Sequence, residues 1–171
     1  TLNVIPNEGG SVMGPLTFNY LEIIHLSQLT VEPAVGWQLT AWTEDEAGLI
    51  PLVFPVTMPA EDLSWFAWFE QIDYTLSLFA NPPQGGTVSD PIIFNWPHTV
   101  EEGDIIASPN TGWEFVGWTL DQEGTEPINL PSNLPPYDAE AYAQFVKIDY
   151  DLSLDAIPTE GGNVAGPMNF N

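Results

Sequence analysis

The clearest pattern in the chain is an alternation of apolar and polar residues. Apolar side chains occupy every second position of the segment 74–80, namely Tyr74, Leu76, Leu78 and Ala80. The same alternation returns at 150–156. A period of two with one polar face predicts a strand in a sheet packed on one side only, which favours an antiparallel sheet.

A second long strand is predicted where two segments, 63–69 and 139–145, share an apolar face. In the first segment this face consists of Leu63, Trp65, Ala67 and Phe69, and we expect it to point inward. The opposite face carries Trp68, which corresponds to Gln144 in the second segment. We therefore expect Trp68 to be exposed.

Shorter strands are predicted at 92–96, 104–108 and 113–119, between turns rich in proline and glycine. Gly85 and Gly86 form one such turn, where glycine permits a positive φ. No segment shows the 3.6-residue period of a helix. The pattern predicts a mainly β fold with little helix.

These elements recur with a period of 76 residues. Residues 153–171 align with 1–19 at twice that offset, and eleven of the 19 pairs are identical. The repeated signature comprises Gly9, Gly10, Trp37 and Trp42 in the first copy and Gly85, Gly86, Trp113 and Trp118 in the second. We expect tandem small antiparallel β modules of 76 residues, β-grasp-like or sandwich-like.

The repeat frame predicts the domain limits. Unit 1 covers 1–73 and has an incomplete first strand, unit 2 covers 74–149, and 150–171 begin unit 3. In this frame Thr1 lies inside a strand, and residues matching 74–76 are expected upstream of it. The chain is therefore expected to be an excerpt from a longer array.

The seven tryptophans divide into two groups. Recurrence of Trp37 and Trp42 favours packing roles, and their spacing of five predicts opposite faces of one strand. Trp96 replaces a tyrosine of the first copy, so its position favours an aromatic ring. Trp68 has no recurring counterpart. Trp68 and Trp96 are the candidate exposed contacts for a sugar or a neighbouring chain.

The charge of the chain limits the classes of partner that it can bind. The chain contains 24 acidic residues and one cationic residue, Lys147, which gives a net charge of −23. Such a surface repels phosphate backbones and anionic lipid, so we expect neither nucleic-acid binding nor membrane insertion. The most apolar run, 48–56, is shorter than the roughly 20 residues that span a bilayer. With 44% apolar residues, packed cores are still expected.

Candidate chemistry is sparse. His25 and His98 each align with a glutamate of the other copy, so neither recurs, and we expect no enzyme and no catalytic residues. Acidic clusters at 44–46 and 121–126 occupy equivalent loops, and calcium prefers oxygen ligands of this kind. No Asp-x-Asp-x-Asp-Gly run occurs, so no cofactor or metal residue is assigned and calcium stays as an alternative.

Several segments carry a family resemblance: YTLSL at 74–78, GGTV at 85–88, ASPNTGWEFVGWT at 107–119 and MPAED at 58–62. The chain resembles the divergent internalin-type B repeat, also called the Listeria–Bacteroides repeat. This resemblance implies a secreted or surface-anchored bacterial protein with tandem β-rich modules of a compact β-grasp-like fold. It implies no catalytic centre.

Together these features favour a non-catalytic tandem-repeat module of a large cell-surface or secreted protein, acting as the stalk or spacer of an adhesin. One alternative is a subunit of an extracellular fibre in which identical chains share strands. Another is a glycan-binding module that uses Trp68 or Trp96. The expected partners are neighbouring repeats, identical chains, and a glycan or protein ligand.

Overall fold

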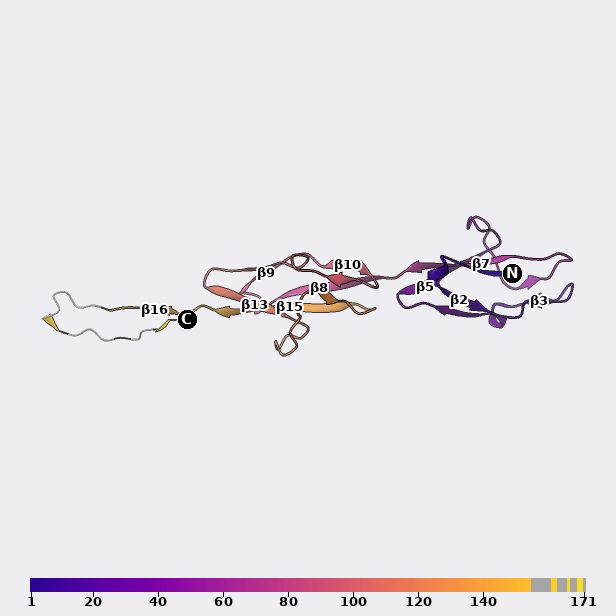
Figure 1. Cartoon of the computed structure of the whole chain (residues 1–171). Coiled ribbons are helices and arrows are strands. Elements are labelled where there is room, and N and C mark those ends of the chain that lie inside the picture. The colour runs from indigo at the N-terminus through magenta and orange to yellow at the C-terminus, as the bar shows by residue number, and fades with distance from the viewer. Residues whose placement is uncertain (155–160, 163–165, 167–168, 171) are drawn as a thin grey trace. The chain divides into compact units, whose positions relative to one another are not determined.

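Figure 1 shows the computed structural model, which describes residues 1–154, 161–162, 166 and 169–170. The chain forms two compact units. The first contains Thr1–Tyr74, Ile93–His98 and Pro135–Tyr137, and the second contains Thr75–Ile92, Thr99–Leu134 and the chain from Asp138 onward. Most of the expected third copy, including Ala156, lies outside the described residues.

The first repeat consists of short strands and two 3-10 turns. A three-stranded sheet has the order β1-β7-β5, and two small hairpin-like pairs, β2 with β4 and β3 with β6, accompany it. The elements are β1 (Leu2–Ile5), η1 (Asn7–Gly9), β2 (Gly10–Met13), β3 (Ile23–Ile24), η2 (Leu26–Gln28), β4 (Thr30–Pro33), β5 (Trp37–Thr43), β6 (Val56–Thr57) and β7 (Trp65–Gln71).

The second repeat follows the same order of strands. Its main sheet has the order β10-β8-β15-β13, with β9 paired to β12 and β11 paired to β14. The elements are β8 (Asp73–Asn81), β9 (Gly86–Val88), β10 (Ile92–Asn95), β11 (Thr99–Val100), β12 (Ala107–Pro109), β13 (Trp113–Thr119), β14 (Ser132–Asn133) and β15 (Ala139–Lys147). Beyond it, β16 (Tyr150–Asp151) pairs antiparallel with β17 (Asn169–Phe170).

The first and last strands of each repeat are neighbours and run parallel. Leu2 of β1 lies opposite Trp65 of β7, and Leu78 of β8 lies opposite Ala141 of β15. The other neighbour of the last strand, β5 or β13, pairs with it antiparallel. Mainly β tandem modules are confirmed, but this strand pair is parallel where the alternation favoured antiparallel. Alternation shows which face is buried, and both pairing directions satisfy it.

The predicted inward face of the last strand is confirmed. Trp65, Ala67 and Phe69 are at most 5% exposed and belong to the core of the first unit. In β15 the matching residues Ala141 and Phe145 are equally buried. The last strand therefore lies in the middle of its sheet with one face covered by the loops and short strands.

A β-bulge corrects the predicted arrangement of the repeated tryptophans. The register of β5 against β7 shifts by one residue just after Leu39, between Trp37 and Trp42. The extra residue reverses the alternation, so both tryptophans face the core, Trp42 within it and Trp37 packed against it. Strand β13 has the same shift between Trp113 and Trp118. The prediction of opposite faces was wrong because a spacing of five assumes an unbroken strand.

The strand predicted at 104–108 begins later, at Ala107. A tight turn precedes it, in which the Asp104 carboxylate accepts a hydrogen bond of 2.8 Å from the backbone of Glu101. Gly103 in this turn has a φ of 100°, which favours glycine. The turn takes up residues that were predicted to belong to the strand.

Candidate functional site

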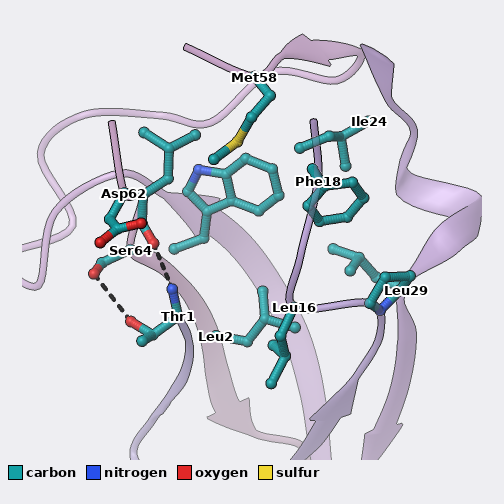
Figure 2. Close-up of a pocket in the computed structure, with 12 residues that line it drawn as sticks. Thr1, Leu2, Leu16, Phe18, Ile24, Leu29, Met58, Asp62 and Ser64 are labelled. Carbon is teal, nitrogen blue, oxygen red and sulfur yellow. Dashed lines mark hydrogen bonds between the residues drawn. The ribbon is translucent and has the colours of Figure 1, made fainter. Parts of the chain in front are cut away.

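A cavity of about 300 Å³ opens at the start of β1 in the first unit. Figure 2 shows Leu16, Phe18, Ile24 and Met58 around it, with Asp62 at its edge. Most of the lining residues are apolar, but polar atoms, including those of Thr1 and Ser64, also form part of the wall, and Asp62 contributes its one carboxylate. Such a site suits an aliphatic or aromatic group joined to a hydrogen-bond donor.

A second site lies where β7 passes under the loop that follows β5. The indole N–H of Trp68 donates to the Thr43 hydroxyl over 2.9 Å. In the second repeat the side-chain amide of Gln144 donates to the Thr119 hydroxyl over 2.8 Å. Two unlike side chains thus make the same contact, because each supplies an N–H at the same place.

Trp68 is half-buried rather than exposed. A Cβ added at Gly48, in the loop above, would lie 3.0 Å from the Trp68 ring. The exposure predicted for Trp68 was therefore wrong, because the loop covers one side of the indole. Trp96 is also half-buried, and a Cβ at Gly36 would lie 3.1 Å from its Cβ, within the first unit.

Each acidic loop is held by hydrogen bonds between an aspartate and the backbone of the same loop. Asp45 accepts hydrogen bonds from the backbone N–H groups of Leu49 and Ile50, at 3.2 and 2.7 Å. Asp121 accepts from Thr125 and Glu126 in the equivalent loop. The Thr125 hydroxyl, supported by these N–H groups, holds the pKa of Asp121 below its ordinary value of 3.8. The carboxylate oxygens that a calcium ion would require as ligands are thus used in hydrogen bonds that hold the loops closed.

The repeated glycines are required mainly for space. A Cβ at Gly9 would lie 2.5 Å from the Cβ of Phe69, and one at Gly85 would meet the Cβ of Phe145. Gly10 has a positive φ, but Gly85 and Gly86, for which a positive φ was predicted, do not. In the second repeat the prediction of a positive φ was therefore wrong. Close approach to the central strand selects glycine there.

Among the residues that the structure describes, no group of three or more His, Asp or Glu side chains is placed to hold a metal ion. The two histidines make unrelated contacts. His98 stacks on Phe94, with ring centroids 5.7 Å apart, and the backbone N–H of His25 donates to Gln28. Neither contact assembles a nucleophile with a base.

The family of the chain follows from a comparison with family models. The divergent InlB B-repeat domain matches residues 1–73 and again residues 75–149. The chain belongs to this family. As a tandem pair of divergent InlB B-repeats, it is a member of a repeat family that is found in bacterial surface proteins and is generally non-catalytic.

No curated protein and no solved structure has a significant match to these InlB-type repeats. The described part of the chain contains no helix with the length and apolarity needed to cross a bilayer. Tandem repeats imply that each repeat has neighbouring repeats of the same chain as partners.

Sequence reasoning missed the cavity beside β1. Its lining residues come from segments that are far apart in the sequence, 1–2, 15–29 and 58–65, so no local pattern indicated it.

Proposed function

We propose that this chain is a non-catalytic spacer in the stalk of a bacterial surface or secreted adhesin, and that its repeats are built to carry tension. The modules of this spacer are 1–73, 74–149 and the beginning of a third at 150–171. Membership in the InlB-type repeat family supports the surface location. The parallel pairing of the first and last strands supports the mechanical role.

The path of the backbone explains why this pairing suits a spacer. The chain enters the first repeat at the Leu2 end of the β1–β7 pair and leaves it at Gln71, beyond the other end. Strand β7 contains seven residues, which at about 3.3 Å per residue span about 23 Å. Each repeat therefore carries the chain from one end of its sheet to the opposite end.

The same path determines how force acts on the sheet. Tension on the two ends slides β1 along β7, so it loads all hydrogen bonds of the pair together. If the strands were antiparallel, both ends of the chain would leave from the same end of the pair, and tension would open the bonds one at a time. Shear across a whole ladder resists force better than this stepwise opening.

The charge of the chain fits a stalk as well. A net charge of −23 with one cation keeps neighbouring copies apart through mutual repulsion at moderate salt. Solution scattering tests this point. A stalk segment stays monomeric at increasing concentration in buffered salt, whereas growth of the particle with concentration would support the fibre alternative.

Single-molecule pulling tests the mechanical role. The chain has no cysteine, so two introduced cysteines provide the only handles for attachment. Handles at Thr1 and Gln71 load β1 and β7 in shear. Handles at Thr1 and Ser64, whose hydroxyls lie 3.0 Å apart, load the same strands from one end. We expect a higher unfolding force for the first pair, and equal forces at the same pulling speed would contradict the proposal.

A further inference from the structure

The loop that follows β5 carries an exposed apolar tip in the first repeat only. The tip consists of Leu49, Ile50 and Val53, which are 80%, 52% and 75% exposed. The equivalent positions of the second repeat, 76 residues further on, are also exposed but hold polar residues, namely Thr125, Glu126 and Asn129. The apolar tip is therefore a property of the first loop and is not shared by the repeats.

The two loops nevertheless have the same backbone structure. The N–H of Glu44 donates to the Ile50 carbonyl over 2.9 Å, and the N–H of Leu120 donates to the Glu126 carbonyl over 2.8 Å. In each loop an aspartate accepts the backbone N–H groups four and five residues further on. Since polar residues support the same loop in the second repeat, folding does not require the apolar tip of the first.

The inward position of the loop gives the opposite result. Leu52 is 8% exposed and belongs to the core of the first unit, and its equivalent, Ile128, is also apolar and half-buried. Packing thus keeps this position apolar in both repeats, whereas the exposed positions differ. Figure 1 shows each loop projecting from its own unit, purple in the first and orange in the second. Large apolar side chains gathered at such a place mark an interaction surface.

The charge of the loop decides what kind of partner fits it. The segment 44–55 contains Glu44, Asp45 and Glu46 and no lysine or arginine. Asp45 is used within the loop, but Glu44 and Glu46 are exposed. A second copy of the chain would bring the same carboxylates and a net charge of −23, so like charges would oppose its docking. A basic partner has the complementary charge.

We propose that the apolar tip is a docking site for a basic amphipathic segment of another protein. Apolar side chains of the partner cover Leu49, Ile50 and Val53, and its lysine or arginine side chains face Glu44 and Glu46. A helix with an apolar stripe between basic residues has this chemistry. The docking site is an addition to the spacer role and does not depend on it.

The first test gives the first loop the polar tip of the second, by the changes Leu49→Thr, Ile50→Glu and Val53→Asn in the whole chain. The probe is a labelled helical peptide of leucine and lysine, with the leucines on one face, and anisotropy measures its binding. We expect the exchange to lower the affinity at least about tenfold. Because the exchange adds a negative charge, weaker attraction of the lysines cannot explain a loss.

Two controls accompany the exchange. Its melting temperatures should stay within about 2 °C of those of the original chain, because the second repeat folds with the same residues. Val116 of β13 is 57% exposed, and Val116→Thr removes this apolar side chain elsewhere on the surface. We expect Val116→Thr to leave peptide binding unchanged. Equal affinities of the original and exchanged chains, or no binding by either, would overturn the proposal.

The charge of the partner is tested separately. Glu44→Gln with Glu46→Gln should lower the affinity for the lysine peptide by about two- to fivefold in low salt, and by less in high salt. A peptide with the same leucines, in which glutamates replace the lysines, should not bind. If the glutamate peptide binds as tightly as the lysine peptide, the assignment of a basic partner is wrong.

Two other occupants are outcomes of the same set of variants. If the original chain sediments with vesicles of phosphatidylcholine and the exchanged chain does not, the tip binds a lipid surface and the proposal is overturned. If the original chain associates with increasing concentration and the exchange abolishes this, a second copy is the occupant, and the proposal is again overturned. A monomer that binds the lysine peptide and ignores the vesicles supports it.

Discussion

Gly9→Ala tests whether close approach to the central strand determines the repeated glycines. Gly9 is buried in the turn η1, against Phe69 of β7. The new methyl group would lie 2.5 Å from the Phe69 Cβ and 3.0 Å from its Cγ, whereas carbon atoms pack at about 3.5–4.0 Å. A Cβ moves only with its backbone, so no change of side-chain rotamer relieves the clash. Either η1 or β7 has to shift by about 1 Å.

The energetic cost can be estimated from overpacked cores. Insertion of a methyl group into a well-packed site costs about 1–3 kcal/mol, and replacing glycine recovers about 0.4–1 kcal/mol by restricting the unfolded chain. At the upper end of both ranges, the free energy of unfolding falls by a net of about 2 kcal/mol. For a unit of this size, 1 kcal/mol corresponds to about 4–8 °C, so the first unit should melt about 8–16 °C lower.

Differential scanning calorimetry of the whole chain provides the assay, since the second unit serves as an internal reference for the first. Gly112→Asn is the control. Gly112 has a φ of 81°, a Cβ at this position would meet no other atom within 4 Å, and asparagine tolerates this backbone region. We expect the control to lower melting of the second unit only slightly. A Gly9→Ala chain that melts within about 2 °C of wild type would refute the steric argument.

Four further measurements test other contacts. Asp121 has a lowered pKa when folded, so its contribution to stability is present above its unfolded pKa and is lost as the pH falls through the folded value. Asp121→Ala should therefore lower the melting temperature of the second unit at neutral pH, by a difference that shrinks below about pH 3.8. The hydrogen bond from Tyr142 to Glu140 raises the tyrosine pKa, and Glu140→Gln should return it toward 10.0 in an ultraviolet titration. Thr43→Val leaves the Trp68 indole N–H without its acceptor and should cost about 2 kcal/mol in denaturant unfolding, less when Trp68→Phe is added. Millimolar calcium should leave both melting temperatures unchanged, because the loop carboxylates already accept backbone N–H groups; an increase would reveal a structural ion.

The elements that sequence could predict are those in which one face is buried along a whole strand. The alternation over 74–80 and the shared face of 63–69 and 139–145 correspond to β8, β7 and β15. The pairing direction could not be predicted, because parallel and antiparallel neighbours place side chains in the same alternation. The bulge in β5 had one signal: the apolar positions change parity between Leu39 and Trp42.

The candidate contact at Trp68 shows a different limit. Its replacement by Gln144 in the second copy looked like a loss of a packing role and hence exposure. The structure gives both residues the same hydrogen bond to a threonine under a loop. Comparison by hydrophobicity conceals this similarity, and comparison by hydrogen-bond donors reveals it.

The segment that joins the two repeats has a consequence for resistance to proteases. Strand β7 ends at Gln71 and β8 begins at Asp73, so only Ile72 separates them. Its N–H donates to the Gly36 carbonyl over 2.8 Å, and its carbonyl accepts from Asn95 over 3.0 Å. Proteases cut where backbone can be drawn out into their active sites, usually at the linkers between domains. Here the linker is the tied-down part, so digestion should begin in the exposed loops of a repeat and spare the junction.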